Sequence, residues 1–105
     1  MRNWTASVIV AFTLASAAYS QEPGNPEAGK ALAQEHCSNC HNIAEGGAFK
    51  LYPPSFAAIG TYMGTDMIRM RIMIPNVHTI MPRFYEIMTA ANLNDLTAYI
   101  VSLEK

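Results

Sequence analysis

Two cysteines and a histidine stand together in one short stretch of the chain, Cys37-Ser38-Asn39-Cys40-His41. Cysteines three positions apart lie on one side of roughly a single helical turn, so both sulfurs can add across the two vinyl groups of one porphyrin. The histidine that follows can then supply an imidazole nitrogen to the iron. A Cys-x-x-Cys-His run is the attachment signature of c-type haem. We therefore predict one covalent haem c, bound through Cys37, Cys40 and His41.

The sequence leaves three other uses of the cysteine pair open. A thioredoxin-type redox pair would lie near a βαβ pattern, which the sequence does not show. A structural zinc site needs two further ligands, and His36 and His78 do not form a recognisable second half of such a site. A plain disulfide would suit an oxidising compartment, but it would leave His41 without a role.

Met81 is the residue best suited to the opposite side of the iron. It stands in a predicted loop and is followed by a proline, so no helix geometry competes with ligation. The methionines from Met63 to Met70 have helical spacing, which is typical of flexible packing residues. His78 or an open position is the alternative. His41 and Met81 together would fill both axial positions, which favours electron transfer and predicts that the protein is not an enzyme.

Four helical segments are expected to position these residues, joined by long loops in an all-α fold. The last segment carries apolar residues at Leu93, Leu96, Ile100 and Leu103, with Tyr99 beside them, in the pattern of a helix packed on a core. The first expected segment is capped by Asn25 and runs from Pro26 into Cys37, and the second is capped by Ser55 and runs through Tyr62. The third is capped by Thr65 and runs from Asp66 to about Ile74. The last begins after its cap, Thr89.

The N-terminus has the composition of an export signal. Arg2 gives a positive start, the stretch from Trp4 to Ala18 is uncharged, and Ala18-Tyr19-Ser20 fits a signal-peptidase site. We expect residues 1–20 to be removed and 21–105 to form a single domain in the periplasm. An uncleaved N-terminal anchor is the alternative. The 85 residues that remain of the 105 bury little apolar surface, so such a chain usually needs a disulfide, metal or cofactor.

The charge balance bears on whether the protein binds nucleic acid. Seven Lys and Arg stand against eight Asp and Glu, and no basic run occurs. Nucleic-acid binding is therefore disfavoured.

The mature chain resembles a class I c-type cytochrome of the small bacterial monohaem type over nearly all its length. The likeness rests on the Cys37–His41 run, on Met81-Pro82 about forty residues later, and on the C-terminal helix Leu96–Leu103. It implies the cytochrome c fold, in which the N- and C-terminal helices cross. Ala28 and Gly29 are small enough to permit that crossing. Two features depart from the family: Asn92 stands where a capping glutamate is expected, and no lysine ring is present.

The resemblance also implies a partner for the proximal histidine, because a proline carbonyl in the family accepts its second N–H; Pro53 or Pro54 matches by position. Tyr62 and Arg83 are candidate donors to the propionates. Several apolar residues are expected to line the haem pocket or the core, namely Phe49, Tyr52, Phe56, Ile59 and Phe84.

These features predict a periplasmic single-electron carrier that works as a monomer. Its partners would be a protein donor and a protein acceptor that dock weakly, with no stable membrane insertion after signal cleavage. The first alternative is a haem electron-transfer subunit of a larger dehydrogenase or oxidase complex, for which the methionine-rich stretch Met63–Met73 would be an interface. The second is a haem sensor, which would need an iron position that opens.

Overall fold

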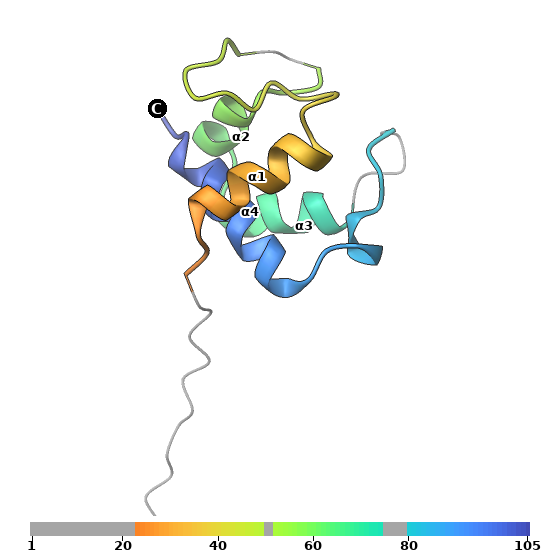
Figure 1. The fold of residues 1–105 in the computed structure, drawn as a ribbon. Helices are drawn as coiled ribbons and strands as arrows, with labels where there is room; N and C mark the ends of the chain where they lie inside the picture. The colour runs from red at the N-terminus through yellow and green to blue at the C-terminus, as the bar shows by residue number, and fades with distance from the viewer. Residues whose placement is uncertain (1–22, 50–51, 75–79) are drawn as a thin grey trace, which may run out of the picture.

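A computed structural model of the chain describes residues 23–49, 52–74 and 80–105. They form four α-helices and one short 3-10 helix, and no β-strand occurs among them (Figure 1). The elements are α1 (Pro26–His36), α2 (Phe56–Tyr62), α3 (Thr65–Met73), η1 (Phe84–Glu86) and α4 (Ala90–Ser102). The predicted all-α fold with four short helices and long loops is confirmed.

Some predictions fall outside the described residues. They concern the signal peptide at residues 1–20 and His78, the alternative to Met81. Among the helices that the structure describes, none combines the length and the apolar character needed to cross a membrane.

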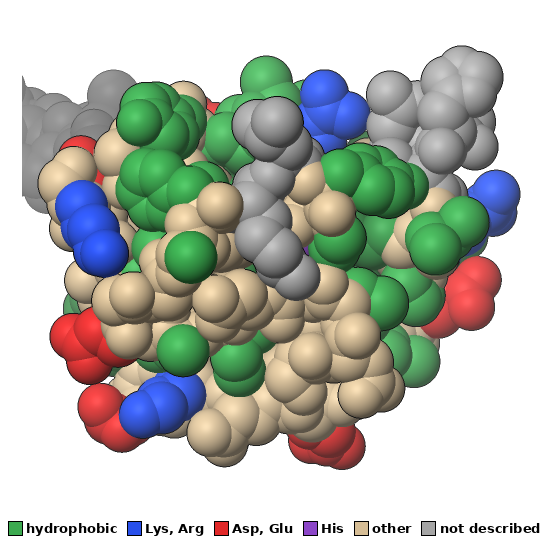
Figure 2. All heavy atoms as spheres, turned by 90° about the horizontal axis from the view of Figure 1, so that it is seen from above, with side chains coloured by type: hydrophobic (Ala, Val, Ile, Leu, Met, Phe, Trp, Pro, Cys, Tyr) green, Lys and Arg blue, Asp and Glu red, His purple; other side chains and the backbone are tan. Residues whose placement is uncertain are grey.

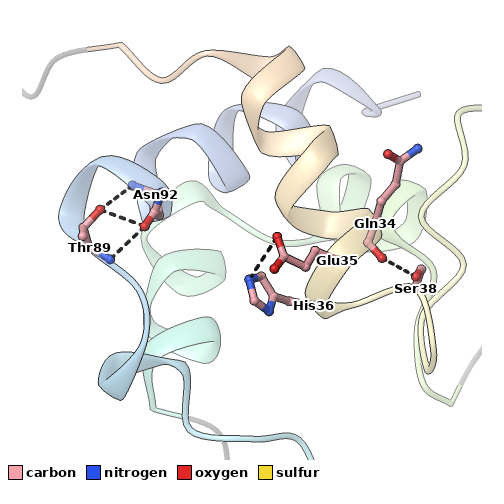
Figure 3. Close-up of polar contacts among 6 residues, drawn as sticks. All are labelled: Gln34, Glu35, His36, Ser38, Thr89 and Asn92. Carbon is pink, nitrogen blue, oxygen red and sulfur yellow. Dashed lines mark hydrogen bonds and ion pairs between the residues drawn. The ribbon is translucent and has the colours of Figure 1, made fainter.

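Three helices begin at the caps expected from the sequence. The Asn25 side chain accepts the Glu27 N–H at 3.0 Å, and Ser55 Oγ accepts the Ala58 N–H at 3.2 Å. At α4 the Thr89 hydroxyl accepts the Asn92 N–H at 3.1 Å, while Asn92 Oδ1 accepts the Thr89 N–H at 3.2 Å (Figure 3). Asn92 thus completes a capping box that glutamate or glutamine usually forms.

The start of α3 differs from the prediction. Thr65 is the first residue of the helix, and the cap is Gly64, which has extended backbone angles and no side chain to bond the first turn. Glycine serves as a cap nearly as well as threonine, so a threonine next to it does not decide the boundary. The helix also ends at Met73, one residue before the predicted end.

The helices α1 and α4 cross closely, and the glycine in α1 makes this possible. A Cβ atom on Gly29 would overlap the Asp95 carbonyl oxygen of α4 and would lie 2.9 Å from Tyr99 Cβ. The Asn25 N–H also donates to Asp95 Oδ1 at 2.8 Å, which ties the start of α1 to α4. The crossing predicted at Gly29 is therefore confirmed; Ala28 is half-buried there.

One apolar core lies between the helices. The stripe predicted on the last helix is buried in it throughout. Residues from α1, α2, α3 and η1 complete the core, among them Ala33, Phe56, Ile68, Ile72 and Phe84.

Candidate haem-attachment site

The attachment stretch is a hydrogen-bonded turn at the end of α1. Cys37 caps the helix and donates its N–H to the Ala33 carbonyl at 2.9 Å. The chain then folds back, because Cys40 and His41 both donate their N–H groups to the Cys37 carbonyl, at 3.2 and 2.9 Å. The Ser38 hydroxyl donates to the Gln34 carbonyl at 2.6 Å and fastens the turn to α1 (Figure 3). One turn therefore presents both sulfurs and the imidazole together.

The two cysteines differ in environment. Cys37 is buried and Cys40 is exposed, and neither is in a disulfide. Burial raises the pKa of the Cys37 thiol to about 11, and the neighbouring Cys40 adds to the increase. Attacking cysteines of thiol oxidoreductases have lowered pKa values instead. The shift at Cys37 therefore disfavours a thioredoxin-type redox pair.

The His41 ring is held by two contacts from the segment that leads into α2. Its Nδ1 lies 2.6 Å from the Pro54 carbonyl oxygen. Because a carbonyl oxygen only accepts, Nδ1 must carry the proton, and the Nε2 of a neutral ring then keeps its lone pair. The Phe56 ring packs against the imidazole at 5.4 Å between centroids. Of the two prolines considered, the structure places Pro54 at the histidine.

Met81 lies in the stretch of residues 80–83, which has no helical structure and leads into η1. Its side chain is half-buried and packs against the core, as do those of Ile43, Ile59 and Met73. A methionine in such a stretch has a sulfur that can be directed by the loop, free of the side-chain directions imposed by a helix.

The predicted apolar lining divides into two groups. Phe56 and Phe84 are buried, and Ile59 is half-buried against the core. Phe49 and Tyr52 are exposed, and Phe49 packs edge-to-face on Tyr62, the exposed candidate propionate donor, at 5.8 Å between ring centroids. Tyr52 is 72% exposed and is not part of the core, so for this residue only the place in the haem pocket stays a prediction.

On the face seen from above, hydrophobic side chains form several groups among polar atoms (Figure 2). Large contiguous apolar patches on a soluble protein mark binding sites. Over the whole described chain, many large hydrophobic side chains are exposed: Phe49, Tyr52, Tyr62, Met63, Met67, Met70, Ile74, Ile80, Tyr85 and Ile87. Exposed apolar side chains in this number are expected of a chain that binds an apolar group or partner.

Among residues 23–49, 52–74 and 80–105, no three His, Cys, Asp or Glu side chains come together in a group that could hold a metal ion. A porphyrin supplies four nitrogen ligands of its own, so the protein needs to add only axial ligands. The donor set here, one oriented imidazole on the same turn as two cysteines that are not in a disulfide, fits an iron porphyrin.

One contact at this site has no signal in the sequence. The Tyr99 hydroxyl of α4 donates to the Ile43 carbonyl oxygen, two residues after His41, at 2.5 Å. The apolar stripe predicted that Tyr99 packs near the core. It did not predict where the hydroxyl points, because the two residues are 56 positions apart.

A protein-family model described as cytochrome C oxidase, cbb3-type, subunit III matches residues 24–100. The match covers the cysteine–histidine turn, Met81 and all of the helices except the end of α4. Comparisons with curated proteins and with solved structures gave no match.

Proposed function

Since the chain belongs to the family described as cytochrome C oxidase, cbb3-type, subunit III, it is a c-type cytochrome with covalently bound haem c, and we propose that it carries single electrons in the periplasm. The bound iron supplies one-electron oxidation and reduction. The proposal rests mainly on one observation: His41 Nδ1 lies 2.6 Å from the Pro54 carbonyl oxygen, and His41 directly follows the two cysteines in the chain. This hydrogen bond fixes the ring and leaves Nε2 as the donor nitrogen.

The residues of the attachment turn hold the group on one side. Cys37 and Cys40 would hold the haem through two thioether bonds, and His41 would bind the iron through Nε2. The Pro54 carbonyl accepts the second N–H of the imidazole, which fixes the tautomer and makes the ligating nitrogen more basic. Phe56 packs on the imidazole and excludes water from this side.

Met81 is the second axial ligand in this proposal. Its half-buried position and the loop that carries it support this role. A thioether ligand together with histidine would raise the reduction potential, and an iron bound by both residues would have no open position for a substrate. The protein then has no catalytic centre of its own. Arg83 and Tyr62, the candidate donors to the propionates, are both exposed.

The carrier role is tested by carbon monoxide binding and by electron exchange. The reduced, purified protein at neutral pH should bind carbon monoxide slowly or not at all, because Met81 occupies the position, and should exchange electrons quickly with small redox mediators. Rapid carbon monoxide binding would favour a haem sensor instead.

Export and cleavage after Ser20 remain part of the proposal. They are supported by the composition of residues 1–20, namely the positive start at Arg2, the uncharged stretch from Trp4 to Ala18 and the small residues before Gln21. N-terminal sequencing of the protein from a periplasmic extract should begin at Gln21. A sequence that begins at Met1 would support the uncleaved anchor.

A haem subunit of a larger oxidase complex is the second candidate. The printed description of the matching family names such a subunit. The exposed side chains of Met63, Met67 and Met70 are an apolar surface that a permanent partner could cover. Size-exclusion chromatography of a gently prepared native extract separates the two functions: a free carrier elutes as a small monomer, and a subunit elutes with a larger protein.

A further inference from the structure

Each of the three residues after Cys40 forms a hydrogen bond with a segment outside the loop that contains it. The His41 side chain donates to the Pro54 carbonyl at 2.6 Å, and the Asn42 carbonyl accepts the Phe56 N–H at 2.9 Å. The Ile43 carbonyl accepts the Tyr99 hydroxyl at 2.5 Å. The first two anchors come from one short segment at the start of α2. The third comes from α4, and of these three hydrogen bonds it is the one that ties the loop to the C-terminal helix.

Tyr99 is also linked to His41 by the packing of aromatic rings. The Phe56 ring lies between the two, with its centroid 5.4 Å from that of His41 and 6.4 Å from that of Tyr99. The Tyr99 ring is buried where α1 and α4 cross, next to Gly29. The close crossing of α1 and α4 is therefore joined, by the Tyr99 hydroxyl and the Phe56 ring, to the segment that carries the imidazole.

The phenol stays protonated over a wide pH range. Burial raises the pKa of Tyr99 above its ordinary value of 10.0, and the charges of Glu45 and Glu27 raise it further. The hydroxyl therefore remains a hydrogen-bond donor at neutral and moderately alkaline pH.

We propose that Tyr99 is a positioning residue for the proximal histidine: its hydroxyl fixes the backbone at Ile43, and through it the direction and strength of the His41–Pro54 hydrogen bond. The proposal rests on the proposed ligation of the iron by His41. Without the Tyr99 anchor the half-buried Ile43 carbonyl loses its partner, and the segment 41–43 is held only at the Pro54–Phe56 side.

The expected consequence is a change in redox equilibrium. A weaker hydrogen bond to Pro54 makes the imidazole less basic, because less negative charge builds up on the ring. When the ligand becomes less basic, ferric iron loses more stabilisation than ferrous iron does. The equilibrium therefore shifts towards the reduced form, and the midpoint potential rises. Tyr99 would therefore set the potential without touching the iron.

The test compares the holoprotein variants Tyr99→Phe and Tyr85→Phe with the wild type. Tyr99→Phe keeps the buried ring and removes only the hydroxyl, and Tyr85→Phe is the control because it makes the same change at an exposed tyrosine of η1. Two quantities are measured: the solvent-exchange rate of the His41 Nδ1 proton by NMR of the reduced protein, and the midpoint potential.

For Tyr99→Phe we expect proton exchange to become at least tenfold faster. The reduction equilibrium should shift about threefold towards the reduced form, or about 28 mV at 59 mV per tenfold change. The Tyr85→Phe variant should match the wild type. Values for Tyr99→Phe that equal those of the control, or a potential that falls, would overturn the proposal.

The same spectra separate this proposal from the proposed function. If His41 binds the iron, its ring protons in the reduced wild type are strongly shifted by the porphyrin ring current. Unshifted His41 signals in the wild type would contradict the ligation itself. Shifted signals with no effect of Tyr99→Phe would contradict only the role of Tyr99.

Discussion

Replacing Gly29 with alanine tests the crossing of α1 and α4, on which the position of the attachment turn depends. The added Cβ would lie 2.9 Å from Tyr99 Cβ, whereas carbon atoms pack at about 3.5 Å or more. It would also overlap the Asp95 carbonyl oxygen, which is helix backbone and cannot move without α4. The helices must therefore separate by about 0.6 Å or more at this point.

The free-energy cost follows from two opposing effects. Overpacking of this kind costs about 1–3 kcal/mol, and a contact with backbone favours the upper end of that range. Alanine in a helix interior gains back about 1 kcal/mol relative to glycine. We expect Gly29→Ala to lower the free energy of unfolding by about 2 kcal/mol, which for a domain of this size lowers the melting temperature by about 8–16 °C.

The assay is guanidinium unfolding of the ferric holoprotein, followed by circular dichroism in the far ultraviolet. Gly64→Ala is the matched control, because no atom lies within 4 Å of a Cβ at that position. As Gly64 caps α3, its replacement should cost less than about 1 kcal/mol. A Gly29→Ala protein as stable as the wild type would show that the helices do not cross closely in solution.

Three further predictions concern the site and its support. Cys37→Ala/Cys40→Ala should give a largely unfolded chain, because a core this small loses the group that completes it; native-like circular dichroism of the double variant would contradict this. Met81→Ala should abolish the weak absorption band at the red end of the visible spectrum that arises from sulfur-to-iron charge transfer, and retention of the band would assign the ligand to another residue. Stability should fall as pH rises above about 10, because the pKa of Tyr99 is raised in the folded protein and the unfolded chain releases that proton first. Tyr99→Phe should remove that part of the alkaline decline in unfolding experiments at successive pH values, and an unchanged pH profile would refute the assignment.

Local rules located the helices because the signals lie within a few residues of each boundary. Asn25, Ser55 and Thr89 were each predicted as caps, and each accepts a backbone N–H of the first turn. Thr65 failed as a cap because Gly64 can take the extended conformation equally well. The 3-10 helix η1 was not predicted, since three residues are too few to give a periodic pattern.

The site was predictable where the covalent chemistry fixes the spacing, as it does from Cys37 to His41. It was less predictable where contacts join distant segments. The sequence could not distinguish Pro53 from Pro54, because the choice depends on how the loop before α2 folds back over the histidine. The bond from Tyr99 to Ile43 depends on the crossing of α1 and α4, which no short motif encodes. Tyr52 was predicted among the lining residues from its type alone, yet its side chain is exposed.

The covalent attachment of the porphyrin to Cys37 and Cys40 is tested most directly by the intact mass of the denatured, acid-acetone-extracted protein. We predict a coloured polypeptide whose mass equals that of residues 21–105 plus one haem. A colourless polypeptide with the mass of the amino acids alone would contradict the account.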